Sequence, residues 1–137
     1  MTGYFSNLLA VLVGSAIGGA LRYWISGLVQ GRMGERFPWG TLAVNVTGSF
    51  LVGILAVLAT TTSPLAVGEA QKFLIVGICG SYTTVSSFAL QTLALARNAQ
   101  WRSALGNIVA SLGFCMLGVW LGFYLAGRVF AATGGLS

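Results

Sequence analysis

Four long apolar stretches, joined by short polar turns, limit what this chain can fold into. A membrane-crossing helix needs about 20 largely apolar residues, and the chain passes that test at 4–29, 38–61, 71–96 and 101–127. With 56% hydrophobic and only 7% charged residues, a soluble domain of this length would lack the polar surface that it needs. We therefore predict an all-α integral membrane protein, with a single four-helix transmembrane domain over residues 1–137.

Basic residues stand singly near the predicted helix ends, where membrane interfaces collect them. The net charge is +5, but isolated interfacial charges do not form a surface for nucleic acid. One side of the predicted bundle has Arg32, Arg36, Arg97 and Arg102, and the other has Lys72 and Arg128. This bias weakly favours a cytoplasmic position for the first and third loops, so insertion in both directions stays open.

The first segment repeats Gly14, Gly18 and Arg22 at four-residue spacing, so all three share one helix face. Two small residues on a face favour close helix packing. Arg22 lies several residues inside the apolar stretch, where a guanidinium is costly unless it reaches the interface or lines a wet cavity. Close packing and a positive vestibule for anions both remain open at this face.

The third segment departs furthest from a continuous membrane helix. Residues 77–88 read GICGSYTTVSSF, with two glycines, five Ser or Thr hydroxyls and a tyrosine. Glycine weakens a helix and Ser/Thr hydroxyls compete for its backbone groups, so we predict a break near Gly80 to Thr84. Irregular backbone at membrane depth is tolerated only inside protein or beside water. Freed carbonyls could hold a small cation and hydroxyls could bind an anion, which favours an ion site.

Polar residues also stand within the second and fourth segments. Thr41 and Asn45 lie on one side of the second, and the Asn45 amide is deep enough to need a partner other than lipid. Asn107, Ser111 and Cys115 follow one another at four-residue spacing in the fourth. Hydrogen bonding between helices and the lining of an ion path both remain open here.

Acidic residues and histidine are missing from the predicted spans. The sequence has no His, and its two acids, Glu35 and Glu69, stand in a loop or at a helix start. The predicted spans therefore have no acid or histidine that could serve in enzymatic catalysis. A small multidrug exporter of four helices would need a carboxylate inside the membrane, so that class is disfavoured. A membrane assembly factor that transports nothing remains open.

Three ordered signatures resemble the Fluc family of fluoride channels, also called CrcB. They are GGALRY at 18–23, WGTLAVN at 39–45, and GICG at 77–80 followed by Thr83 and Thr84. The resemblance covers essentially the whole chain. It implies an antiparallel dual-topology dimer in the cell membrane, with two pores that let cytoplasmic fluoride leave passively and so give fluoride resistance.

The resemblance also implies roles for individual residues. Backbone carbonyls of Gly80 and Thr83 would hold a structural sodium ion at the dimer interface, and Arg22 would belong to a vestibule. The candidate fluoride-pathway residues are Arg22, Thr41, Asn45, Thr84, Ser87, Phe88, Ser111 and Cys115. Fluoride is small and strongly hydrated, and this set supplies NH and OH donors and the positive edge of an aromatic ring in place of water.

The chain departs from the family pattern at the pore. TTVSSF stands at 83–88 where the family usually reads TTFSTF, so Val85 replaces a phenylalanine. Gln91 stands where the family often has Glu, Ser81 where it has Gly, and Cys115 where serine is common. Each pore in the family draws on both subunits. We therefore expect either a heterodimer with a homologue that supplies the missing ring, or a homodimer that conducts fluoride more weakly.

Overall fold

The computed structural model describes residues 2–61 and 70–132, and every regular element in these ranges is helical. In chain order the elements are α1 (Thr2–Met33), α2 (Trp39–Thr61), the π-helical η1 (Lys72–Cys79), α4 (Gly80–Tyr82), α5 (Val85–Arg97) and α6 (Trp101–Ala132). Four spans are long and apolar enough to cross a membrane, as predicted: Tyr4–Met33, Trp39–Thr60, Lys72–Arg97 and Trp101–Ala132.

The first and last helices run further than the apolar stretches suggested. α1 continues to Met33 instead of residue 29, and α6 continues to Ala132 instead of residue 127. Apolar length measures what lipid can cover, whereas backbone hydrogen bonding continues through polar residues such as Gln30 and Arg32. The predicted ends at 29 and 127 were therefore too early.

A tight turn joins α1 to α2, and the Gln30 side chain holds it. Gly34 ends α1 at φ +89°, a conformation that favours glycine. Gln30 Nε2 donates to the carbonyls of Gly34 and Phe37 at 2.6 and 2.9 Å, and its Oε1 accepts from the Gly40 amide at 3.0 Å. One side chain therefore fixes the angle at which α2 leaves α1.

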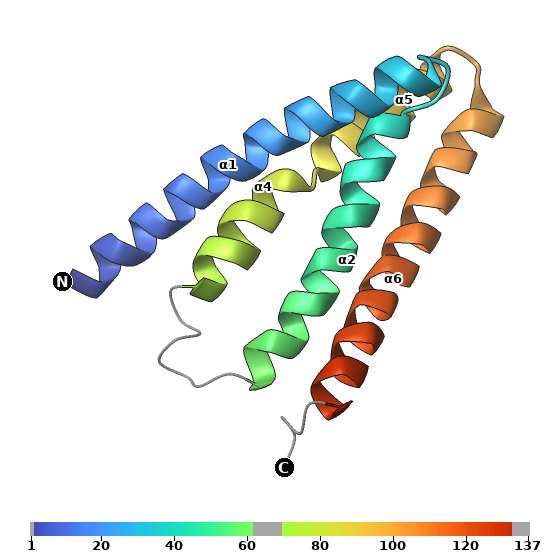
Figure 1. The fold of residues 1–137 in the computed structure, drawn as a ribbon. Helices are drawn as coiled ribbons and strands as arrows, with labels where there is room; N and C mark the ends of the chain where they lie inside the picture. Colours follow the sequence, from blue (N-terminus) through green and yellow to red (C-terminus); the bar gives the residue numbers. More distant parts are fainter. Residues whose placement is uncertain (1, 62–69, 133–137) are drawn as a thin grey trace.

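The helices form two closely packed pairs that spread apart toward the chain termini (Figure 1). α2 lies along α6, and α1 lies along η1 and α4. The turns at 34–38 and 98–100 lie at one end of the bundle, with the start of α1 and the end of α6 toward the other. The third span thus sits between α1 and α2, where its middle faces both.

Glycine lets both pairs approach closely. A side chain at Gly18 would strike the Ile78 carbonyl of η1, and one at Gly122 would strike the Phe50 carbonyl of α2. Gly14 and Gly118 are similarly confined by backbone atoms of the partner helix. The close-packing interpretation of Gly14 and Gly18 is therefore confirmed, and small residues let these helices approach as in other membrane bundles.

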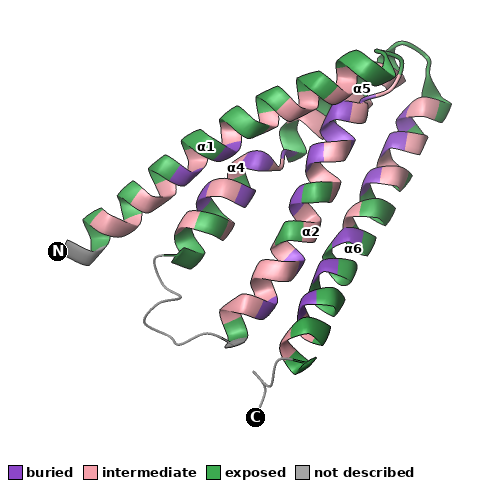
Figure 2. Cartoon of the chain, viewed as in Figure 1, coloured by how far each residue is buried: buried purple, intermediate pink, exposed green. Residues whose placement is uncertain are grey.

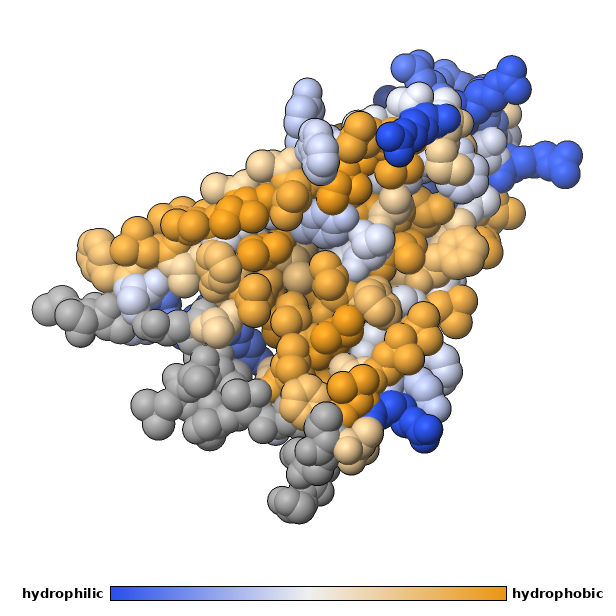
Figure 3. Space-filling view, viewed as in Figure 1, coloured by the Kyte–Doolittle hydropathy of each residue, from blue (hydrophilic) through white to orange (hydrophobic). Residues whose placement is uncertain are grey.

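Large apolar side chains cover the outside of the bundle instead of filling its interior (Figures 2 and 3). Among the described residues, the largest side chains that are exposed by less than 2% are those of Val44 and Asn107. Leu90, Trp101 and Met116 are each more than 60% exposed. A surface of this kind suits lipid, and hydrophilic residues gather at the loop end in Figure 3.

Candidate ion-permeation site

Two extended residues interrupt the helical run of the third apolar segment. The helix runs to Tyr82, after which Thr83 adopts φ −82°, ψ 158° and Thr84 adopts φ −152°, ψ 115°. Gly80 itself is still helical, so the break lies at the C-terminal end of the predicted range. Thr83 remains attached to the preceding turn, because its N–H and Oγ1 both donate to the Cys79 carbonyl at 3.0 Å.

Thr84 starts the helix that follows the break. Its Oγ1 accepts from the Ser87 N–H at 3.2 Å and donates to the Ser87 Oγ at 3.1 Å. This is the N-cap arrangement that Ser and Thr favour, since it satisfies an amide that has no partner within the helix. The hydroxyl run that weakens the long helix therefore also restarts it.

Asn45 on α2 holds the open backbone of Thr84 by two hydrogen bonds. Its Nδ2 donates to the Thr84 carbonyl at 3.0 Å, and its Oδ1 accepts from the Thr84 N–H at 2.7 Å. Thr84 is only 7% exposed, so without this partner both backbone groups would be buried and unpaired. The sequence predicted that the Asn45 amide needs a protein partner, and this partner is the break itself.

The same break changes what the carbonyls of Gly80 and Thr83 can bind. In a continuous α-helix they would accept from the N–H groups of Thr84 and Ser87. Those two groups donate instead to Asn45 Oδ1 and Thr84 Oγ1. Carbonyl oxygens without their usual helical donor are the ligands that hard cations prefer. The chemistry of the residues predicted to hold sodium therefore fits the ion.

A pocket of about 430 Å³ opens beside the break. We call it the break pocket, and it lies between α2, the break, α5 and α6. Its polar and aromatic lining comes from Asn45, Ser49, Thr83, Thr84, Phe88, Ser111 and Cys115, and its apolar lining from Val52, Val85, Leu112, Met116 and Val119. Polar groups thus meet one ring inside a largely apolar wall, as in many small-ligand sites.

Five of the eight predicted fluoride-pathway residues line the break pocket: Asn45, Thr84, Phe88, Ser111 and Cys115. Ser87 is adjacent through its hydrogen bonds to Thr84. Ser111 is buried at 9% exposure, and its hydroxyl has no hydrogen-bond partner within the part of the chain that the structure describes. That hydroxyl is free to meet a ligand in the pocket.

Three other predicted residues lie away from the break pocket. Gly80 is exposed on the helix before the break, and Thr41 lines a pocket of about 620 Å³ near the loop end, together with Gln91. Arg22 lines neither of these pockets. It is half-buried, and no hydrogen bond or ion pair joins it to another described residue.

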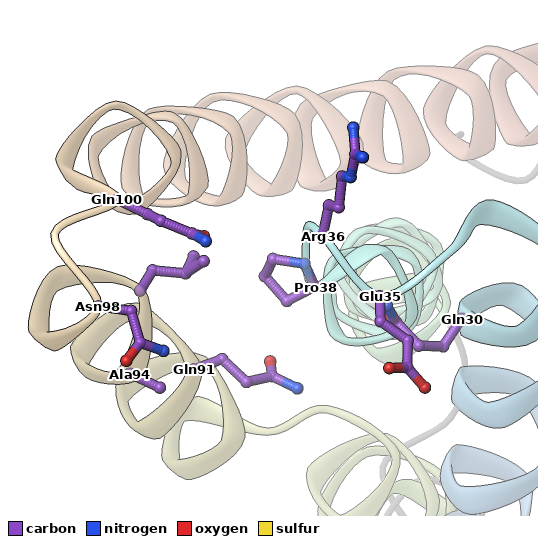
Figure 4. Close-up of a pocket in the computed structure, with 9 residues that line it drawn as sticks. Gln30, Glu35, Arg36, Pro38, Gln91, Ala94, Asn98 and Gln100 are labelled. Carbon is purple, nitrogen blue, oxygen red and sulfur yellow. The ribbon is translucent and has the colours of Figure 1, made fainter.

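A further pocket, of about 480 Å³, lies at the loop end (Figure 4). Residues from the α1–α2 turn and from the end of α5 face each other across it. It shares Gln30 and Gln91 with the pocket that Thr41 lines, so the two openings are neighbours. The Gln91 Oε1 atom is buried with no hydrogen-bond partner, which leaves an amide oxygen for water at this polar entrance.

Sequence reasoning missed several contacts that shape the site. A side chain at Gly48 would strike the Thr83 methyl group, and the Thr47 hydroxyl lies 2.9 Å from the Tyr82 hydroxyl. The sequence does not single out Thr92, whose hydroxyl accepts a hydrogen bond from Asn107 and so joins α5 to α6. The spacing of residues in the sequence places them on one face of a helix. It does not show which residue of another helix they contact, and the bonded residues here are 15 to 39 positions apart.

Residues 9–123 match the family described as CrcB-like protein, Camphor Resistance (CrcB). The chain belongs to the CrcB-like family. This match covers most of the chain and confirms the resemblance drawn from the three signatures. Together with the four apolar spans it makes this CrcB-like chain a multi-pass protein of the cell membrane.

Curated relatives of the CrcB-like chain extend over almost its full length. It is 52% identical over 122 residues to fluoride-specific ion channel FluC 2 of Bradyrhizobium diazoefficiens, which covers 88% of this chain and 89% of the relative. It is 49% identical over 115 residues to fluoride-specific ion channel FluC of Rhodospirillum rubrum, at 83% and 89% coverage. It is 48% identical over 138 residues to fluoride-specific ion channel FluC 2 of Rhodopseudomonas palustris, at 96% and 100% coverage.

Proposed function

We propose that this chain is a passive, fluoride-selective channel and not an enzyme, through which cytoplasmic fluoride leaves the cell. The observation that carries the proposal is the break pocket, where hydrogen-bond donors and a phenylalanine meet beside an interrupted membrane helix. Relatives about half identical in sequence are named fluoride-specific ion channels. Export by such a channel would give the cell resistance to fluoride.

The lining of the break pocket suits an ion that must lose its water. An asparagine amide carries two N–H groups, and Asn45 uses one of them on the Thr84 carbonyl, which leaves the other for an anion. The Ser111 hydroxyl offers a second donor, and the edge of the Phe88 ring is electropositive. Donors fixed by packing replace hydration without being reordered as the ion passes.

Transport through this site needs no fuel. No acid stands within the sequence of the four spans, so a carboxylate that would couple export to protons is missing from them. A membrane potential that is negative inside drives an anion outward by about 2.3 kcal/mol per charge per 100 mV. Arg22, half-buried on α1, would add positive charge along the approach to the pore.

We further propose that two chains insert in opposite directions and form an antiparallel dimer with a sodium ion at the interface. Two observations support this arrangement. Basic residues favour one side of the predicted bundle only by four to two, and the break pocket is lined in part by outward-facing side chains such as Val85 and Met116. Gly80 and Thr83 carbonyls from both chains would hold the ion, since their helical donors are engaged elsewhere. Sodium would then fix the distance between the two breaks.

Val85 favours a second candidate, a heterodimer. Its side chain is 78% exposed at the edge of the break pocket, where the family pattern has a phenylalanine. A homologue that carries this ring could complete the aromatic lining, because each pore in the family draws on both subunits. The proposal is then a channel in which this chain is one of two unlike subunits.

Flux from vesicles tests the proposal. The purified chain is reconstituted alone into liposomes loaded with potassium fluoride, and efflux is followed with a fluoride electrode while a potassium ionophore lets K⁺ leave with the fluoride and so prevents charge build-up. Matched vesicles contain chloride. Fast loss of fluoride with chloride retained supports a homodimeric channel. If a folded dimer passes no fluoride alone but does so when a homologue with phenylalanine at the Val85 position is added, the heterodimer is supported; no flux in either case contradicts a channel and leaves an assembly role.

A further inference from the structure

Helix α5 carries Phe88 but has little packing of its own. None of its 13 residues is buried within the chain, and its main neighbour is α6, with few contacts to α2. Apolar packing within the chain therefore does little to decide where α5 lies along α6. Polar contacts must therefore fix the position of α5. Asn45 does this at the N-terminal end of α5 through its hydrogen bonds to Thr84.

A second polar connection joins α5 to α6 about two helical turns after Thr84. Asn107 of α6 is 1% exposed, and its Nδ2 donates to the Thr92 Oγ1 at 2.8 Å. The Thr92 hydroxyl donates in turn to the Phe88 carbonyl at 2.7 Å. A hydroxyl has one hydrogen, which is used on Phe88, so Thr92 can only accept from Asn107. The two hydrogen bonds therefore have a fixed order of donors: Asn107 donates to Thr92, and Thr92 donates to the backbone carbonyl of Phe88.

The spacing of these residues relates this connection to the break pocket. Thr92 lies four positions after Phe88, and Asn107 lies four positions before Ser111. One helical turn on each side thus separates the Thr92–Asn107 contact from the two pocket residues, Phe88 and Ser111. A shift of α5 along α6 would move Phe88 relative to Ser111 and would leave the buried Asn107 amide without its partner.

We propose that Asn107 is a positioning residue, which acts through Thr92 to place the Phe88 ring opposite Ser111. The inference rests on the proposed fluoride path through Phe88 for its effect on transport. The placement of Phe88 itself can be measured without any flux. Asn107 and Thr92 do not line the break pocket, so their effect on transport would pass through the position of α5.

The first test reads the position of the ring directly. The full chain is labelled with 4-fluorophenylalanine at position 88, and its ¹⁹F spectrum is recorded in detergent for the wild type, Thr92→Val and Thr92→Ser. Valine has the shape of threonine without its hydroxyl, and serine keeps the hydroxyl. We expect the resonance to shift or broaden in Thr92→Val and to stay in place in Thr92→Ser. An unchanged spectrum in Thr92→Val, or equal changes in both variants, would overturn the inference.

The second test reads transport per folded channel. Thr92→Val is expected to lower fluoride efflux by about three- to tenfold, the effect of losing one hydrogen bond that acts on the barrier, and to raise chloride leakage. Thr92→Ser should match the wild type. Thr60→Val is the matched control, because the Thr60 hydroxyl bonds locally to the Val57 carbonyl. If Thr92→Val lowers only the amount of folded protein, Asn107 is merely structural. If the wild type passes no fluoride either alone or with a homologue that has phenylalanine at the Val85 position, the proposed function fails and the ¹⁹F result alone decides the inference.

Discussion

Asn45 and Thr84, 39 positions apart, form a reciprocal amide pair, with the Asn45 side chain donating to the Thr84 carbonyl and accepting from its N–H. This pairing replaces the bonds that the backbone loses where the helix is interrupted. Asn45 therefore has two roles in this account: it holds the break open, and it offers its remaining N–H to an ion. A variant can separate these two roles only if it changes either the Nδ2 donor or the Oδ1 acceptor of Asn45 and keeps the other.

Replacement of Asn45 tests the pair itself. Asn45→Ala leaves the buried N–H and carbonyl of Thr84 unpaired, at about 1–3 kcal/mol for each group, so we expect both a large loss of stability and loss of fluoride flux. Asn45→Asp keeps the acceptor for the Thr84 N–H but removes the donor and adds negative charge. It should also lose stability, because a carboxylate oxygen would face the Thr84 carbonyl within the membrane, and it should conduct no fluoride. Thermal unfolding in detergent and vesicle efflux measure the two effects, and wild-type flux in either variant would contradict the account.

Gly48 allows α2 to pass the break. A methyl group there would strike the Thr83 methyl and lie 3.1 Å from the Tyr82 ring, so Gly48→Ala must push α2 away from Thr83. Overpacking of this kind costs about 1–3 kcal/mol, and we expect lower thermal stability together with reduced flux. Gly31→Ala is the matched control, since nothing lies within 4 Å of the added group. Equal stability of the two variants would show that the close approach at Gly48 is not needed.

The Thr84 hydroxyl should matter as the cap of α5. Thr84→Val removes the oxygen that accepts from the Ser87 N–H, whereas Thr84→Ser retains it. Loss of an N-cap costs about 0.5–2 kcal/mol, so Thr84→Val should melt earlier than Thr84→Ser. Hydrogen exchange followed by mass spectrometry should show faster exchange at the start of α5 in the valine variant alone. Identical exchange in the two variants would contradict a capping role.

The sequence predicted the helices and the break but not the partners across the bundle. Apolar length located the four spans, and the run of glycine and hydroxyl residues located the interruption to within a few positions. Both are local properties of the chain. The Asn45–Thr84 pair and the contact between Thr92 and Asn107 depend on how the helices are rotated and offset, which a single sequence does not encode locally.

Position along the helix explains why one predicted site residue lies apart from the break pocket. Thr41 stands one turn before Asn45 on the same face of α2 and lines the pocket of about 620 Å³ near the loop end. The close packing of Gly14 and Gly18 on η1 fixes the α1 face that also holds Arg22. The π-helical geometry of η1 was not predicted, because a wider helical turn has no distinct signature in composition.

Val85 gives a prediction on subunit pairing. The side chain is 78% exposed within the chain, so Val85→Phe has room for a ring. If the chain pairs with itself and conducts weakly because this ring is missing, Val85→Phe should raise fluoride efflux, by about tenfold for each 1.4 kcal/mol taken from the barrier. Val85→Leu adds apolar volume without a ring and serves as control. An equal rise in both variants would assign the effect to volume instead of to the aromatic edge.

The central claim is that fluoride itself crosses the membrane through this chain. The most direct measurement is the reversal potential of the current through the purified wild-type protein in a planar bilayer, with unequal fluoride on the two sides. We expect the current to reverse at the equilibrium potential of fluoride, to keep this reversal potential when the chloride gradient is altered, and to be lost in Asn45→Ala. A reversal potential that follows chloride would contradict this claim. So would a folded wild-type protein that carries no current either alone or together with a homologue that has phenylalanine at the Val85 position.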